Sequence, residues 1–165
     1  MAKLVQAAGL KCVRRSQLTP SAPLDTDVRV ILGDSLGELF AYYAACDVAF
    51  VGGSLVPLGG QNLIEAASVG CPVLIGPHTY NFAQAAALAI EMGAATRVDD
   101  ANELIAVAQR LLADAPTRQL MGQAGRAFAA RHRGATARVT ALIEPLLNSD
   151  PFRPDPPHSI PPPPP

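Results

Sequence analysis

A glycine-rich segment that follows a short apolar run is the feature that most constrains the fold of this chain. Residues 48–51 (Val-Ala-Phe-Val) are apolar without alternation, which is typical of a strand covered on both faces. Gly52 and Gly53 allow a sharp turn out of that strand. A second pair, Gly59 and Gly60, follows five residues of loop. The pattern therefore predicts a strand, a loop and the start of a helix.

The residues after the second glycine pair indicate where that helix begins. Asn62 is a suitable N-cap, and Glu65 stands three residues later in capping-box register, ahead of the apolar residues 66–69. A helix start behind glycines offers free backbone N–H groups and a positive dipole end to an anion. We therefore expect a nucleotide or sugar-phosphate ligand at the carboxyl end of a parallel sheet.

Composition and charge exclude several classes of protein. The chain has 165 residues, of which 49% are hydrophobic, and this fits a globular α/β domain with its own core. The net charge of −1 argues against a dedicated nucleic-acid binder. Cys12, Cys46 and Cys71 form no CxxC pair, so neither a disulfide framework nor a metal site is indicated, and reduced cysteines are expected. No apolar run is long enough for a membrane span, and no signal peptide is indicated.

Strand-like and helix-like segments alternate along the chain. This alternation predicts a Rossmann-like parallel sheet with helices on both faces, in one domain over residues 1–147. From residue 148 on, prolines dominate, and a disordered or polyproline II tail is expected over 148–165. The predicted strands cover 11–16, 28–32, 48–51, 71–75 and 94–98, and the predicted helices cover 2–9, 36–45, 62–69, 81–92, 100–114, 116–132 and a last segment ending near 147.

Three loops with glycine leave the carboxyl ends of predicted strands. These ends meet at one edge of a parallel sheet, so we expect the loops to form a crevice with carboxylates for hydroxyl groups and amides for phosphate. The candidate ligand-binding residues are Gly33, Asp34, Ser35, Gly37 and Glu38 in the first loop; Gly52, Gly53, Ser54, Gly59, Gly60, Gln61, Asn62 and Glu65 in the second; and Gly76, Pro77, His78 and Asn81 in the third.

Each of these residues also has a structural interpretation. Glu38 and Glu65 can simply complete capping boxes, and Asn62 and Asn81 can simply be N-caps. A carboxylate at Glu65 could also accept both hydroxyls of a ribose. His78 is open between a proton donor, a phosphate ligand and a turn residue. The chain contains no P-loop and no serine in a nucleophile-elbow setting.

A basic segment lies between Asp114 and Glu144, where the sequence has no acidic residue. A solvated helix face explains it, and the alternative is a patch that faces an anionic membrane or a phosphorylated acceptor. Its basic residues are Arg118, Arg126, Arg131, His132, Arg133 and Arg138.

Four motifs together resemble the carboxyl-terminal half of bacterial 3-deoxy-D-manno-octulosonic acid (Kdo) transferases. They lie in order at 33–39, 49–55, 59–66 and 76–82, and the resemblance covers about residues 2–147. It implies one half of a GT-B glycosyltransferase, the half that binds the donor CMP-Kdo. The family transfers Kdo to the lipid A precursor (lipid IVA) in lipopolysaccharide biosynthesis, at the cytoplasmic side of the inner membrane. Peripheral membrane contact, a soluble fragment and no metal or cofactor are the expectations that follow.

The resemblance also assigns roles to individual residues. Gly60, Gln61 and Asn62 would lie by the CMP phosphate, Glu65 by the ribose, and residues 33–38 would help to line the nucleotide or Kdo pocket. Members commonly have histidine where this chain has Gln61, so a charged role there is not expected.

The resemblance places no catalytic residue in this chain. The family's general base is a glutamate of the amino-terminal, acceptor-binding domain, and turnover is expected only when that half is supplied. Two alternatives remain open at this point: half of another GT-B enzyme that uses a UDP-sugar, and a truncated, non-catalytic nucleotide-binding module.

Overall fold

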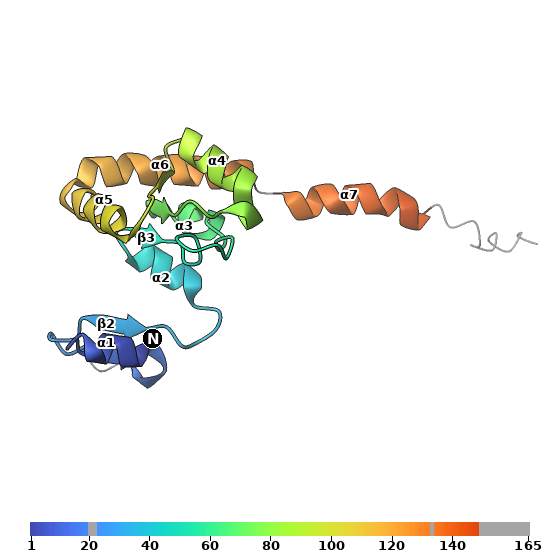
Figure 1. Ribbon diagram of the computed structural model, residues 1–165. Helices are drawn as coiled ribbons and strands as arrows, with labels where there is room; N and C mark the ends of the chain where they lie inside the picture. Colours follow the sequence, from blue (N-terminus) through green and yellow to red (C-terminus); the bar gives the residue numbers. More distant parts are fainter. Residues whose placement is uncertain (20–22, 133, 149–165) are drawn as a thin grey trace, which may run out of the picture. The chain divides into compact units, whose positions relative to one another are not determined.

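The computed structural model describes residues 1–19, 23–132 and 134–148 (Figure 1). Residues 1–129 form one compact unit, and a second unit begins at Ala130. The predicted proline-rich tail, apart from Asn148, lies outside the described residues. The prediction of one domain over residues 1–147 stays a prediction.

The described residues contain five short parallel strands, which form two sheets. The first sheet pairs β1 with β2, and the second has the order β3-β4-β5. The predicted α/β class with parallel strands is confirmed, although the described strands pair in two sheets rather than in one. The strands are β1 (Cys12–Arg14), β2 (Val30–Leu32), β3 (Ala49–Phe50), β4 (Val73–Ile75) and β5 (Ala95–Arg97).

Strand β3 is an edge of its sheet. The N–H groups of Ala49 and Val51 donate to carbonyls of the β4 segment, at 2.9 and 3.0 Å. Backbone groups of successive residues point to opposite sides of a strand, so those of Phe50 point away from β4. Among the described strands, none pairs with that side of β3. In the described residues, therefore, no backbone ladder connects β3 to the first sheet.

Helices connect the strands. Each predicted helix is present, with shifted ends. The α-helices are α1 (Ala2–Ala7), α2 (Leu39–Ala45), α3 (Ile64–Ser68), α4 (Ala83–Glu91), α5 (Ala101–Ala113), α6 (Ala115–Arg131) and α7 (Ala135–Asn148), with short 3-10 helices η1 (Arg15–Gln17) and η2 (Tyr80–Phe82).

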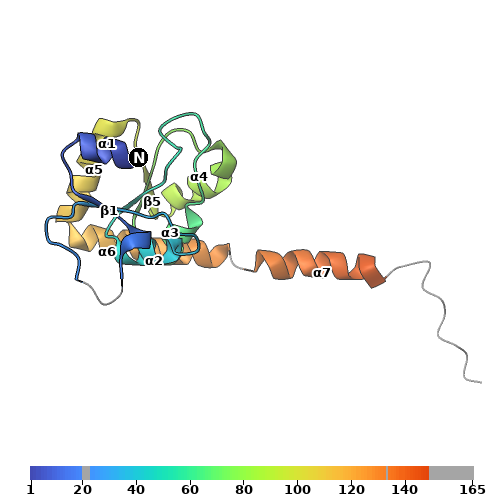
Figure 2. The same cartoon turned by 90° about the horizontal axis from the view of Figure 1, so that it is seen from below.

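The core is built on both faces of β4, whose three residues are fully buried. Val73 and Ile75 pack in a cluster with alanines of α3 and α4 and with Phe128 of α6. Leu74 points to the other face and packs with residues of α5 and with Met121. Both faces of the sheet are therefore covered by helices, as predicted, and α3, α4 and α6 lie close to the sheet in both views (Figure 2).

The predicted helix starts are right at Asp100 and wrong at Ser35, Asn62 and Asn81. Asn62 is not the N-cap of α3, because the N-cap is Leu63 and the Asn62 side-chain amide donates to Glu65. Asp100 caps α5, since its carboxylate accepts from the N–H groups of Asn102 and Glu103 at 2.8 and 2.9 Å. Helix α2 begins at Leu39 instead of residue 36, with Glu38 as its N-cap, and the Ser35 hydroxyl donates to the Glu38 carboxylate instead of accepting from an N–H of the helix. Asn81 lies inside η2, and α4 begins two residues later.

Two arginines of the predicted basic segment bind backbone carbonyls. Arg118 donates to the carbonyls of Leu111 and Leu112 at 2.6 and 2.7 Å, and Arg126 donates to that of Val69 at 3.3 Å. These contacts give both side chains structural roles. The membrane-facing alternative for the segment stays a prediction. None of the described helices is long and apolar enough to cross a bilayer.

Helix α6 packs closely against the turn at Gly70. A Cβ atom built on Gly122 would collide with the carbonyl oxygen of Gly70, and one built on Gly125 would lie 3.0 Å from the carbonyl oxygen of Ala67. Glycine at these two helix positions therefore allows backbone-to-backbone contact between α6 and the end of α3.

We predict that Gly122→Val lowers the free energy of unfolding by about 2–3 kcal/mol, because its side chain forces α6 away from the turn. The matched control is Ala127→Val on the exposed face of the same helix, which should cost about 0.5 kcal/mol from helix propensity alone. Urea titration of both variants measures the difference. Equal losses in the two variants would contradict the close approach.

Candidate functional site

The loops that follow β3 and β4 are bound to each other by Ser54. Its side chain is fully buried, and its hydroxyl donates to the carbonyl of Val51 at 2.5 Å and accepts from the N–H of Gly76 at 2.8 Å. The carbonyl of Ser54 accepts from the N–H of His78 at 2.9 Å. One residue of the second loop therefore fixes the backbone of the third.

Glycines let these two loops touch. A Cβ atom on Gly76 would collide with the carbonyl of Ser54, and one on Gly59 would collide with the Asn81 side chain. Gly59 also has φ +86°, a conformation that other residues rarely adopt. The N–H of Asn81 donates to the carbonyl of Gly59 at 3.3 Å, and its side-chain amide donates to that of Leu58 at 3.3 Å. The second and third loops are thus joined along their length. The first loop follows a strand of the other sheet, so the predicted meeting of all three loops at one sheet edge is wrong, and the predicted ligand crevice stays a prediction.

Two polar side chains precede and enter α3. The Asn62 oxygen accepts from the N–H of Ile64 at 3.0 Å, and the Asn62 amide donates to Glu65 at 3.0 Å. Helix α3 has only five residues, so its dipole contributes little, and the expected attraction of an anion to this helix start is weak. Asn62 holds Glu65 in one orientation, with both side chains half-buried.

The exposed side chains near the contact between the second and third loops are those that a ligand could reach. Gln61 and Asn81 are exposed and His78 is half-exposed. A hollow of about 370 Å³ is lined by the residues 80–85, which continue the third loop into α4. The joined loops therefore offer amide and imidazole groups at their surface, whereas Ser54 is occupied by holding them together.

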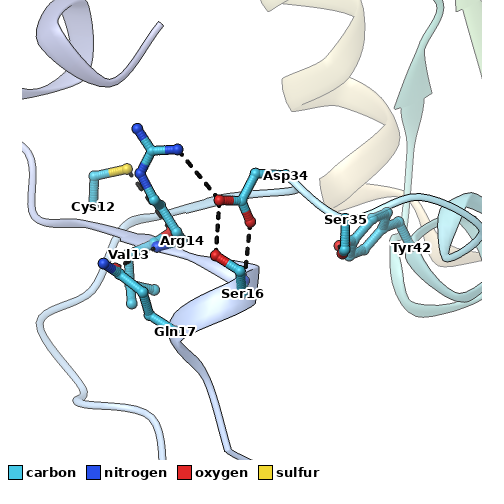
Figure 3. Close-up of polar contacts among 8 residues, drawn as sticks. All are labelled: Cys12, Val13, Arg14, Ser16, Gln17, Asp34, Ser35 and Tyr42. Atoms are coloured by element: carbon cyan, nitrogen blue, oxygen red, sulfur yellow. Dashed lines mark hydrogen bonds and ion pairs between the residues drawn. The ribbon is translucent and has the colours of Figure 1, made fainter.

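The first predicted loop forms a separate polar network. The Asp34 carboxylate accepts from the Ser16 N–H at 2.9 Å and from its hydroxyl at 2.8 Å, and pairs with Arg14 at 3.2 Å (Figure 3). The hydrogen bonds from Ser16 hold the pKa of Asp34 below its usual range. Asp34 thus ties the end of β2 to the end of β1.

Glu38 forms a second polar cluster in the same loop. Ser35 and Tyr42 donate to its carboxylate, and Arg15 pairs with it at 2.8 Å. The hydrogen bond from Ser35 is the main reason why the pKa of Glu38 lies below its usual value. Ser35 and Tyr42 lie together in Figure 3. These contacts give Asp34, Ser35 and Glu38 structural roles within the protein. A role of these residues in ligand binding stays a prediction.

Several residues that order the site were not singled out in the sequence. Arg97 at the end of β5 donates to the carbonyl of Pro77 at 3.0 Å and to the Thr79 hydroxyl at 3.4 Å. The Tyr80 hydroxyl donates to the carbonyl of Pro57 at 2.9 Å. Both contacts join positions about twenty residues apart, and no local pattern indicates them.

We predict that Ser54→Ala lowers the free energy of unfolding by about 1–3 kcal/mol, because the buried N–H of Gly76 then lacks an acceptor. Ser68→Ala is the matched control. Its hydroxyl donates only to the Glu65 carbonyl of its own helix, and the change should stay within about 0.5 kcal/mol of the wild type. Chemical denaturation followed by circular dichroism measures both. If Ser54→Ala lowers the free energy of unfolding no more than Ser68→Ala does, the Ser54 hydroxyl does not hold the two loops together.

We predict that Asp34→Asn lowers the Tm at neutral pH and that the difference from the wild type stays constant down to about pH 5 and narrows as the pH falls from about 4 to about 2. The depressed pKa of Asp34 means that its contribution is complete above the ordinary carboxyl pKa of about 3.9 and is lost as the pH falls through the lower folded value. Thermal melts across this range measure it. A constant gap at all pH values would show that the charge of Asp34 does not stabilise the fold.

Comparisons with known proteins place the chain among glycosyltransferases. It is 51% identical to a 3-deoxy-D-manno-octulosonic acid transferase of Bordetella pertussis over 143 residues. These aligned residues are 87% of this chain and 33% of that protein. A transferase of the same name from Haemophilus influenzae is 36% identical over 148 residues, which are 89% of this chain and 34% of the relative. The chain thus spans about a third of the length of these curated relatives.

A solved structure agrees with these matches. The C-terminal CMP-Kdo binding domain of WaaA from Acinetobacter baumannii superposes with a TM-score of 0.67 at 34% identity, over 74% of this chain and 63% of that one. No family model matches the chain.

Proposed function

We propose that this chain, which belongs to the Kdo transferase family and corresponds to its carboxyl-terminal half, binds CMP-Kdo for transfer of the Kdo group. The two joined loops at the carboxyl ends of β3 and β4 carry this proposal. They present ordered backbone amides and exposed polar side chains at the edge of the sheet where α/β domains of this type bind nucleotides.

The proposed roles follow from the geometry of this edge. The residues that follow Gly60, namely Gln61 and Asn62, receive the phosphate of CMP, whereas the N–H of Gly60 itself donates to the carbonyl of Gly53 at 3.0 Å. Glu65, held by the Asn62 amide at 3.0 Å, accepts the ribose hydroxyls. Gly76 and His78 of the third loop border the same site. Gln61 is neutral, so the phosphate charge is met by hydrogen bonds and not by a cation at this position.

Transfer itself needs groups from the acceptor-binding half of such an enzyme. In this proposal the acceptor is the lipid A precursor, and the complete enzyme acts peripherally at the cytoplasmic side of the inner membrane. The chain described here contributes donor binding, and donor binding requires no metal or other cofactor.

We predict that CMP binds this chain and that Glu65→Gln weakens the binding about tenfold or more, because a neutral amide is a weaker acceptor for the ribose hydroxyls than a carboxylate. Isothermal titration with CMP and UMP measures affinity and base preference, and repeating it with EDTA tests the independence from metal. Glu91→Gln, at the exposed end of α4, is the matched control and should bind as the wild type does.

The outcomes separate the alternatives. Preference for UMP would favour an enzyme that uses a UDP-sugar. Binding of CMP without Kdo transfer, after addition of a folded acceptor-binding half from the Bordetella relative, would favour a non-catalytic nucleotide-binding module. Equal affinities in the Glu65 and Glu91 variants would remove Glu65 from the site.

A further inference from the structure

Two thiols far apart in the sequence lie in contact. The Sγ atoms of Cys46 and Cys71 are 3.2 Å apart, across a separation of 25 residues. Cys46 is the exposed C-cap of α2, and Cys71 is buried, with 3% of its surface exposed, just before β4. Formation of a disulfide between them would require the sulfur atoms to approach by about 1.2 Å, a small movement for an exposed helix end.

We propose that Cys46 and Cys71 are a modification site, at which an anionic disulfide reagent of the glutathione type converts the thiol pair into an intramolecular disulfide. The bond formed would join the end of α2 to the strand that lies at the centre of the core. Neither the family relationship nor the ligand-binding loops assign a role to this pair.

The surroundings of Cys46 admit such a reagent. Cys46 lines a surface cavity of about 340 Å³ together with Arg118 and Arg126. Each guanidinium uses part of its hydrogen-bonding capacity on backbone carbonyls, and Asp47 on the same wall offsets part of the positive charge, at 3.6 Å from Arg118. Two cations against one carboxylate leave the cavity attractive to a reagent that carries carboxylates.

The order of reaction follows from exposure. Burial raises the pKa of Cys71 to about 12, so this thiol stays protonated, whereas Cys46 is at the surface and meets the reagent first. The Cys46 thiolate attacks one sulfur of glutathione disulfide and releases a glutathione thiolate. Once Cys46 carries the glutathionyl group, the Cys71 thiol gives up its proton and its Sγ attacks the Cys46 sulfur as the thiolate. The mixed disulfide breaks, and the departing second glutathione thiolate takes up the proton. Two protein thiols are oxidised and one glutathione disulfide is reduced to two thiols.

The disulfide would close a loop around the candidate site. Residues 46–71 include β3, the second glycine loop and α3, with Asn62 and Glu65. A cross-link across this segment removes conformational freedom from the unfolded chain and so raises the Tm. That the stiffened segment is a donor-binding one rests on the proposed function, but formation of the bond does not.

The test is oxidation of the full chain with glutathione disulfide, alkylation of the remaining thiols and peptide mapping by mass spectrometry. We expect a Cys46–Cys71 linked peptide, alkylated Cys12, and a Tm several degrees higher that returns to its starting value with dithiothreitol. The Cys12→Ser variant should behave like the wild type. The exposed-site variant Cys46→Ser should fold and show neither the linked peptide nor the rise in Tm.

Other outcomes would overturn the proposal. These are a stable glutathione adduct on Cys46 with Cys71 alkylated after unfolding, a bond to Cys12, or no oxidation in a chain whose Tm shows that it is folded. Because this assay contains no nucleotide, its failure is distinct from a failure of CMP to bind.

Discussion

The hydrogen bonds of the buried Ser54 hydroxyl are the interaction on which the candidate site depends. A short strand such as β3 ends after two residues, and the chain beyond it has no ladder to hold it. The Ser54 hydroxyl holds this part of the chain instead, because it accepts from the N–H of Gly76 and donates to the carbonyl of Val51 in its own loop. The carboxyl ends of β3 and β4 are thereby fixed to one another, and the amides near Gly60 are ordered before any ligand arrives, which lowers the entropic cost of binding.

Glycine allows this arrangement in two different places. At the site, Gly76 lets its loop touch the backbone at Ser54, and Gly59 leaves room for the side chains of Asn81 and Tyr80. On the other side of α3, Gly122 and Gly125 let α6 approach the end of the same helix. A helix of five residues is not stable by itself, so α3 is held in position by contacts at both ends. The same packing brings the end of α3 near α6 and sets Cys71 beside Cys46.

The family relationship and the local geometry assign different weights to the predicted residues. The second and third loops are joined, as expected of a donor-binding edge, and Glu65 is oriented by Asn62. Asp34 and Glu38 are already neutralised by Arg14 and Arg15 and by hydroxyl donors. The first loop therefore supports the β1–β2 pair, and in the proposed function the donor is held chiefly by the second and third loops.

The sequence by itself determined the class of fold, the order of the elements and the family, because apolar runs, N-caps such as Asp100 and the ordered glycine motifs are local signals. It misplaced the starts of α2 and α4, where Ser35 and Asn81 bind other partners than the expected helix ends. Only the tertiary structure decided that Ser54 joins two loops, that Arg97 orders the third and that two cysteines meet. These contacts join residues 18 to 25 positions apart, and a distant partner leaves no trace in the local pattern of either residue.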